Sequence, residues 1–410
     1  MENKVVITGM GVVSPLGNDV ESLWKSICAG QSGISPVTRF DPSELPTRIA
    51  GQVSQEALEG QSSKDMRRRD LYTIYALIAS NQAWRQSGLD IARENPERCG
   101  TVVGSGIGGI HTLEEGHAAF LNGGYKKLSP LTIPKLLSNI AAGEVAIQLG
   151  LKGPNRAIIT ACATGAQCIS EAASTIRLGQ ADVMVAGGSE ASVTPFAMAG
   201  FCAMKAMSRR NEEPQRASRP FDMDRDGFVM GDGAGIVVLE SEAHAKARGA
   251  AILGELAGFG ETCDAHHITA PVPDGSGAIG AMRAALADAH LTPDRVHYFN
   301  AHGTSTKHND ASESMALQAV FGNAMPPVSS TKSMTGHLLG AAGSLEAILC
   351  MLAIRDGVLP PSINYDTPDP ECAVNIIANE AREAKVEVAM SNSLGFGGHN
   401  ASIILKRYNG

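Results

Sequence analysis

The sequence predicts an α/β fold, and the pattern of its apolar residues is the main reason. Short β-branched runs at residues 5–7, 183–185 and 236–239 alternate with alanine-rich stretches that favour helices. Continuous apolar runs of this kind are typical of strands buried on both faces between layers of helices. Further runs lie at residues 101–103, 158–159 and 401–405.

A faint internal duplication indicates that the fold has two similar halves. Gly165 and Gly343 each follow small residues, and each begins a run that contains an Ile-Arg pair and ends at a second glycine, Gly179 or Gly357. Two helices of matched length, packed closely through small residues at their starts, explain both copies.

The 410 residues exceed the usual length of one domain, so we expect two core-forming units. The first unit is residues 1–250, closed by a basic helix at 243–248, and the second is residues 251–410. Two segments are expected to be ordered excursions from the sheets: residues 208–226, which are arginine-rich, and residues 359–371, which are rich in proline.

The composition is that of an ordinary globular protein. Hydrophobic residues make up 43% of the chain, and the formal net charge of −8 argues against general nucleic-acid binding. No apolar run is long enough to span a membrane, and the acid in the first residues does not fit a secretory signal. We therefore expect a cytoplasmic protein that binds neither membranes nor nucleic acids.

Eight scattered cysteines form no C-x-x-C pair and no disulfide framework, which suits a reducing compartment. Cys263 with His266 and His267 could imitate a zinc cluster, but a fourth ligand is missing, so no metal site is expected.

Cys162 carries the most informative local signal. It lies among small residues between a β-like run at 156–160 and a helix-like run at 164–178. The partial positive charge at a helix start favours the thiolate, which is the reactive form of cysteine. The alternative is a small buried hydrophobe, because free cysteines are among the most buried residues. The local sequence leaves both open.

Two segments carry histidines suited to acid–base chemistry. His302 lies in a loop of glycine and hydroxyl residues after a strand-like run at 296–299. Lys332 and His337 lie at or just before the second duplicated helix, whose start could keep an imidazole neutral. Glu346, in an apolar stretch, needs a partner such as Lys332. The alternatives are a turn histidine satisfied by neighbouring hydroxyls and a structural ion pair.

Phe396 is surrounded by three glycines in residues 395–398. We interpret this segment as a mobile aromatic flap whose free backbone N–H groups could bind an oxyanion. The alternative is a tight glycine turn with a core phenylalanine.

Four segments in this order, residues 160–165, 300–306, 332–337 and 395–400, resemble the β-ketoacyl-acyl-carrier-protein synthase II family. These are elongating condensing enzymes of the thiolase superfamily, and the resemblance runs essentially end to end. It also covers residues 5–11, 217–222, 225–235 and 263–270. The resemblance implies the thiolase fold, a five-layered αβαβα sandwich of two duplicated halves, and a homodimer.

The resemblance also implies a reaction, in which an acyl group on Cys162 condenses with malonyl-carrier protein to give β-ketoacyl-carrier protein and carbon dioxide in fatty-acid elongation. The backbone N–H groups of Cys162 and Phe396 form the oxyanion hole. His302 and His337 bind the malonyl thioester oxygen, and Lys332 and Glu346 support them. No metal or redox cofactor is implied.

The family pattern also implies residues that bind substrate. Thr304 and Thr306 lie near the malonyl thioester and the pantetheine arm, Phe396 is the gate, and Ile107 and Phe201 line the acyl pocket. The alternative for Ile107 and Phe201 is plain core packing.

Acyl-carrier protein is acidic, so a negatively charged enzyme needs a local basic rim. Exposed charge clusters are usually no more than solvated surface, which is the alternative here. The candidates are Lys64, Arg67, Arg68 and Arg69, then Lys126 and Lys127, and then Lys205, Arg209 and Arg210.

The sequence departs from the common family pattern at Lys307 and His308, where many relatives carry proline or small residues. This departure concerns the shape of the loop after Thr306 and leaves the chemistry unchanged.

The rival classes fit less well. A NAD-dependent dehydrogenase is suggested by the glycine pattern at 104–109, but the expected acid is missing from residues 123–127. A degradative thiolase would carry a second cysteine in its glycine loop, where this chain has His399. A non-catalytic chain-length factor would lack Cys162. A ketosynthase of a dedicated polyketide or specialised-lipid pathway stays open as the alternative function.

Overall fold

The computed structural model describes residues 4–410, and its first half is built on a five-stranded sheet. The strand order is β5-β4-β6-β7-β1. The pairs β5–β4 and β4–β6 are parallel, and the pairs β6–β7 and β7–β1 are antiparallel. The strands are β1 (Val5–Val13), β4 (Cys99–Gly104), β5 (Asn155–Arg156), β6 (Val183–Glu190) and β7 (Gly233–Ser241).

The second half repeats this sheet. Its strand order is β10-β9-β13-β14-β8, again with the first two pairs parallel and the next two antiparallel. Antiparallel pairing of β1 with β8 joins both halves into one ten-stranded sheet. The strands are β8 (Gly254–Cys263), β9 (Tyr298–Asn300), β10 (Val328–Ser329), β13 (Val388–Gly395) and β14 (His399–Lys406).

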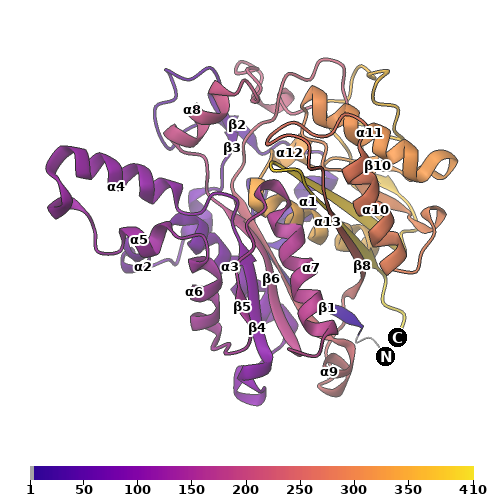
Figure 1. Ribbon diagram of the computed structural model, residues 1–410, viewed down its shortest axis with the longest axis horizontal. Coiled ribbons are helices and arrows are strands. Elements are labelled where there is room, and N and C mark those ends of the chain that lie inside the picture. Colours follow the sequence, from indigo (N-terminus) through magenta and orange to yellow (C-terminus); the bar gives the residue numbers. More distant parts are fainter. Residues whose placement is uncertain (1–3) are drawn as a thin grey trace.

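Helices form three layers around these sheets (Figure 1). Helices α3 (Leu71–Ser87) and α6 (Ile140–Leu149) cover the outer face of the first sheet, and α10 (Ser276–Asp288) covers that of the second, with α11 (Lys307–Phe321) packed on α10. The middle layer is α7 (Thr164–Arg177) with α13 (Ala342–Asp356), each of which contacts strands of both halves. This confirms the predicted αβαβα sandwich.

The middle helices show why the duplicated segments begin with small residues. A side chain at Gly165 would lie 2.8 Å from the backbone nitrogen of Ser344, and one at Gly343 would lie 2.9 Å from that of Ala166. The two helices therefore approach through their glycines, as the sequence predicts.

The remaining elements connect these layers or project from them. The segment 110–136, here called the arm, leaves the body of the molecule on the left of Figure 1. The helices are α1 (Val20–Cys28), α2 (Ser63–Arg68), α4 (Ile110–Gly123), α5 (Thr132–Leu136), α8 (Pro195–Ala203), α9 (Glu242–Ala247) and α12 (Lys332–Thr335). The short strands are β2 (Ile34–Pro36), β3 (Ile49–Gly51), β11 (Val358–Leu359) and β12 (Arg382–Glu383).

Two sequence predictions of strands need correction. The β-like run at 156–160 is not a strand beyond Arg156, because the chain leaves the sheet and Ile158 packs its carbonyl oxygen over Gly104. The run at 158–159 is thus a connection to Cys162. The strand expected at 296–299 is β9, which is shifted to Tyr298–Asn300.

The other predicted segments are confirmed. The basic helix is α9, and the excursions at 208–226 and 359–371 have no α-helix and almost no strand in the structure. In the described residues 4–410, no helix has the length and apolar character needed to cross a bilayer.

Candidate active site

Cys162 lies in a strained turn at the start of the middle layer. It belongs to the 3-10 turn Ala161–Ala163, which precedes α7, and Ala161 has a φ of 49°. The other half repeats this turn at Leu339–Ala341 before α13, where Leu339 has a φ of 46°. Cys162 is 7% exposed and lines a cavity of about 640 Å³. The thiol is therefore buried and yet reachable.

The resting thiol of Cys162 is protonated, which differs from the sequence prediction. Burial raises its pKa to about 12, and the charge of Glu190 adds to this shift. The Lys332 ammonium and the backbone N–H groups of Phe396 and Cys162 act in the opposite direction. Burial outweighs the helix start, so the thiol must lose its proton during the reaction.

Two histidines face this sulfur. The Sγ of Cys162 and one ring nitrogen each of His302 and His337 lie within 4.8 Å of one another. The two rings are edge to face, with centroids 5.2 Å apart. Burial and the Lys332 charge hold the pKa of both imidazoles well below the usual value, so both are neutral. Three such groups could also hold a metal ion, so the geometry alone leaves two kinds of chemistry open.

The hydrogen bonds of His337 identify its tautomer. Its Nδ1 accepts a hydrogen bond of 3.3 Å from the backbone N–H of Leu339, so Nε2 carries the hydrogen in the neutral ring. Leu339 begins the 3-10 turn that runs into α13, so this hydrogen bond comes from the helix start, as the sequence analysis expects. Burial and the Lys332 charge lower the pKa of His337 and favour the same neutral form.

His302 is held by an acid that the sequence analysis missed. The carboxylate of Glu313, on α11, accepts hydrogen bonds of 2.8 Å and 2.7 Å from the backbone N–H groups of His302 and Gly303. Burial raises the pKa of Glu313 to about 7. The sequence does contain a signal for this role, because Glu313 is an acidic residue on the buried side of a helix. The Nδ1 of His302 has no hydrogen-bond partner within residues 4–410.

Lys332 and Glu346 form the buried ion pair that the sequence predicts. Each side chain is fully enclosed, and burial raises the pKa of Glu346 to about 7 although Lys332 opposes the shift. The Lys332 charge acts on Cys162, His302 and His337, so the pair lies directly behind the three facing groups.

Phe396 lies in the tight hairpin turn between β13 and β14, where Gly397 and Gly398 have φ values of 87° and 75°. The left-handed backbone of both glycines explains why this turn needs them. The phenyl ring is half-buried at the cavity, and its centroid is 6.3 Å from that of Phe201. Aromatic contacts continue from Phe201 through Phe228 to the ring of His337.

Thr304 and Thr306 line the same cavity, and their hydroxyl oxygens are 2.8 Å apart. The fully buried guanidinium of Arg225 donates to the carbonyl oxygens of Thr306 and Lys307 and pairs with Asp310. Arg225 thereby fixes the backbone of residues 304–307, here called the threonine loop. The sequence analysis missed this role, although Arg225 lies in a segment that carries the family resemblance.

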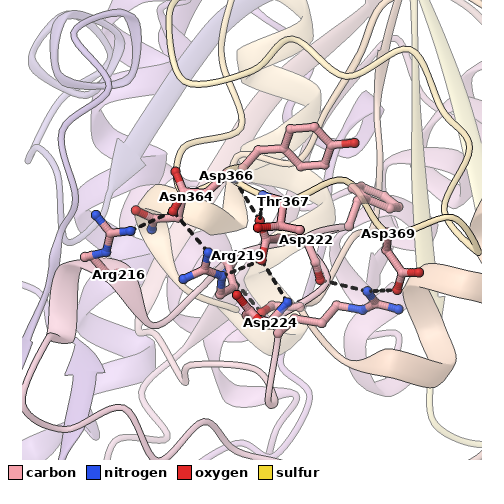
Figure 2. Close-up of polar contacts among 12 residues, drawn as sticks. Arg216, Arg219, Asp222, Asp224, Asn364, Asp366, Thr367 and Asp369 are labelled. Carbon is pink, nitrogen blue, oxygen red and sulfur yellow. Dashed lines mark hydrogen bonds and ion pairs between the residues drawn. The ribbon is translucent and has the colours of Figure 1, made fainter.

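Arg225 pairs with Asp369 and donates to the carbonyl oxygen of Asp222. It thereby belongs to a network that joins the two excursions, whose members Arg219, Asp222 and Asp366 are shown in Figure 2. The carboxylate of Asp222 accepts hydrogen bonds from the backbone N–H groups of Asp366 and Thr367 and pairs with Arg219. Arg216 also pairs with Asp366. The excursions are thus one ordered layer behind the threonine loop.

Several other predicted residues surround the entrance. Ile107 and Phe201 line the cavity, and so do Lys205, Lys307 and His308. Lys307 and His308 lie in the first turn of α11.

The predicted basic residues differ in their surroundings. Arg69 pairs with Asp65 and Glu144, and Arg210 lies 3.7 Å from Glu213. These two arginines are partly neutralised. The exposed residues are Lys64, Arg67 and Arg68 on α2, Lys126 and Lys127 in the 3-10 turn after α4, and Lys205 and Arg209 near the cavity.

Comparison with protein-family models identifies the two domains of one family. The model of the beta-ketoacyl synthase N-terminal domain matches residues 2–245, and that of the C-terminal domain matches residues 253–366. The chain is 51% identical to 3-oxoacyl-[acyl-carrier-protein] synthase 2 of Vibrio cholerae, with 99% of each chain covered. It is 48% identical to the protein of that name from Staphylococcus aureus, with 99% of this chain and 98% of the relative covered.

Solved structures of β-ketoacyl synthases and related ketosynthases have the same fold as this chain. The TM-score is 0.93, at 34% identity over 100% of both chains, with a type II polyketide ketosynthase that was solved in complex with its acyl-carrier protein and bound to the hexaketide. A beta-ketoacyl synthase from Burkholderia phymatum gives 0.92 at 35% identity, also over 100% of both chains. The chain belongs to the β-ketoacyl synthase family. It is a condensing acyltransferase of fatty-acid elongation, and the dehydrogenase rival is excluded.

Proposed function

We propose that this chain condenses an acyl group held on Cys162 with malonyl-acyl-carrier protein, giving β-ketoacyl-carrier protein and carbon dioxide. The observation that carries this proposal is the convergence of one thiol and two neutral imidazoles within 4.8 Å in a cavity. Relatives named for acyl-carrier protein share about half of the sequence.

Acyl transfer uses the protonated thiol. As Sγ attacks the thioester carbonyl, a neutral imidazole takes the thiol proton, the bond to the carrier sulfur breaks, and the carrier thiol receives a proton. The backbone N–H groups of Cys162 and Phe396 both face the sulfur, so the thioester oxygen can lie between these two donors.

Decarboxylation needs donors for the developing enolate. The Nε2–H of His337 can donate to the malonyl thioester oxygen, and His302, whose ring packs edge to face with that of His337, supplies the second donor. The malonyl carboxylate leaves as carbon dioxide, the enolate carbon attacks the acyl carbonyl, and the sulfur of Cys162 leaves as a thiolate that takes a proton from water. Lys332 is a positioning residue whose charge keeps both imidazoles neutral, and Glu346 holds the Lys332 ammonium in place.

The remaining cavity residues bind the substrate. Thr304 and Thr306 present hydroxyls to the pantetheine arm, Ile107 and Phe201 form the acyl pocket, and Phe396 is the gate between them. The contact between the Phe396 and Phe201 rings supports this arrangement.

The carrier protein would dock on the basic side of the entrance. Lys205 lines the cavity, and Arg209 is exposed four residues further along the chain. These two residues are therefore the best-supported contacts with the carrier protein. Lys64, Arg67 and Arg68 on α2 are a second exposed group.

We also propose a homodimer, formed by the arm and by the edge strand β5. The arm exposes large apolar side chains, including Leu121 at 70% and Tyr125 at 74%. Exposed apolar surface of this extent marks interaction sites. Strand β5 ends the ten-stranded sheet, so its outer edge can pair with a second copy.

The proposed division into units at residue 250 is supported by the repeated sheets, since β8 opens the second sheet at Gly254. A cytoplasmic location agrees with the free cysteines of the chain. A ketosynthase of a polyketide or specialised-lipid pathway is the alternative function, favoured by the likeness to the polyketide ketosynthase.

Acylation of Cys162 tests the proposed function. Incubation with acyl-carrier protein should leave an acyl adduct on the Cys162 peptide by mass spectrometry, and Cys162→Ala should abolish it. Cys168→Ala, which changes another buried thiol on the following helix, is the matched control. An adduct that persists in Cys162→Ala would exclude the mechanism.

A further inference from the structure

The glycine-rich loop at residues 104–109 follows β4 and has the spacing of a phosphate-binding loop, yet its donors are occupied from within the protein. The carboxylate of Glu190, at the end of β6, accepts hydrogen bonds from the backbone N–H groups of Gly106 and Ile107, at 2.8 Å and 3.2 Å. An internal carboxylate thus lies where such loops usually hold a phosphate.

Glu190 is fully buried and joins three separate segments. Its carboxylate also accepts hydrogen bonds from the hydroxyl of Ser105, within the glycine loop, and from the hydroxyl of Ser192 beyond β6. A further hydrogen bond of 3.0 Å comes from the backbone N–H of Gly340. Within residues 4–410, no lysine or arginine forms an ion pair with Glu190. Burial raises the pKa of Glu190, and the hydrogen-bond donors around the carboxylate oppose this shift by stabilising its charge. Moving the carboxylate would leave these donors unsatisfied.

Close packing explains two of the glycines. A side-chain carbon at Gly106 would lie 2.7 Å from Oε2 of Glu190, and one at Gly340 would lie 2.8 Å from that atom and 2.3 Å from the nitrogen of Gly106. Both glycines are needed for the carboxylate to approach the loop and the turn together.

The segments that Glu190 holds form walls of the cavity around the nucleophile. Ile107 is itself one of the loop residues bonded to Glu190, and Leu339 precedes Gly340; both side chains line the cavity with Cys162. Ile107 also packs against the apolar cluster that contains Cys162 and Leu339.

We propose that Glu190 is a positioning residue that fixes Ile107 relative to Cys162 and thereby sets the length of acyl chain that the pocket accepts. This inference rests on the proposed acylation of Cys162. The same carboxylate acts on the sulfur through its charge, since Glu190 raises the pKa of Cys162 while Lys332 lowers it. Removal of the charge should therefore change both chain-length preference and thiol reactivity.

The test compares Glu190→Gln with Ser192→Ala, which removes one donor to the same carboxylate but keeps its charge and its bonds to the loop. Acylation of Cys162 is measured by mass spectrometry over a series of saturated acyl-carrier proteins of increasing length. In Glu190→Gln the ratio of rates for the longest and shortest chains should change at least about tenfold, whereas Ser192→Ala should keep the wild-type ratio.

Alkylation of Cys162 by iodoacetamide as a function of pH is the second readout, and it does not depend on the proposed function. The alkylation profile of Glu190→Gln should move to lower pH. Because opening of the pocket would also lower the pKa of the buried thiol, the variant must keep the wild-type melting temperature for this shift to count as the effect of the Glu190 charge. If Glu190→Gln does not fold, Glu190→Asp replaces it. The shorter side chain should still change the chain-length ratio, whereas the retained charge should leave the alkylation profile as in the wild type.

An unchanged length ratio in a folded variant, or an unchanged alkylation profile in Glu190→Gln, overturns the inference. A wild-type protein that no acyl-carrier protein acylates overturns the proposed function instead.

Discussion

The sulfur of Cys162 shows how far a single residue's environment can differ from its local sequence. A helix start favours a thiolate, but burial raises the pKa of this thiol to about 12. Neutral imidazoles nearby can take the proton at the moment of attack, so a protonated resting thiol is compatible with catalysis. The Lys332 charge is the main opposing influence on the sulfur.

This balance predicts the pH dependence of the thiol. Because only the thiolate reacts, alkylation of Cys162 should keep rising with pH beyond pH 9, where an ordinary cysteine levels off. Replacing the ion pair together, Lys332→Met with Glu346→Gln, should slow alkylation at pH 8 by about tenfold for each unit that the pKa rises. Peptide-level mass spectrometry separates Cys162 from the exposed Cys263, which serves as internal control. Faster alkylation in the double variant would contradict the role of Lys332.

A second prediction concerns His302. His302→Ala should leave acylation of Cys162 nearly intact but slow malonyl decarboxylation by about 100–1,000-fold, since one enolate donor is lost. Release of carbon dioxide from malonyl-carrier protein measures this step. His308→Ala, which changes an exposed histidine at the same entrance, should keep the wild-type rate. Equal rates for His302→Ala and wild type would remove the assigned role.

At the scale of elements, the site is assembled where the turns before α7 and α13 meet the end of β13. A side chain at Gly395, the last residue of β13, would lie 2.6 Å from the carbonyl oxygen of Thr160 and 3.3 Å from the nitrogen of Cys162. The hairpin is therefore pressed against the nucleophile turn, which holds the backbone N–H of Phe396 near the sulfur.

The contact between the hairpin and the nucleophile turn predicts how removal of the Phe396 ring affects acyl loading. Phe396→Ala removes the ring between the entrance and Phe201, so acyl loading rates should change unequally along a series of chain lengths, while melting temperature changes little because the ring is half-buried. Stopped-flow loading assays measure this. Phe120→Ala on the arm is the control. Loading rates unaltered at every length would dismiss the gate.

For the whole molecule, the repeated sheets place the chemistry between the two halves. The first half supplies Cys162, and the second supplies both histidines, the ion pair and the hairpin of Phe396. Neither half alone forms the cavity. The arm leaves the body on the side of the first half (Figure 1). Its exposed apolar side chains are the basis of the dimer interface proposed above.

The dimer can be tested on the arm. Leu121→Glu with Tyr125→Glu places charges in the proposed interface, so sedimentation should show monomers where the wild type shows dimers. Leu178→Glu, an equally exposed leucine at the end of α7 and outside the arm, should remain dimeric. A wild-type monomer, or a dimeric arm variant, would refute the proposed interface.

The sequence by itself determined the α/β class, the duplicated middle helices and the nucleophile with its histidines, because these depend on local composition and on motifs of fixed spacing. It also predicted the pairing of Lys332 with Glu346, since a buried charge requires a partner. Only the tertiary structure decided the protonation of Cys162 and the roles of Glu313, Arg225 and Glu190. Burial and contacts between distant segments control these, and neither can be read from neighbouring residues in the chain.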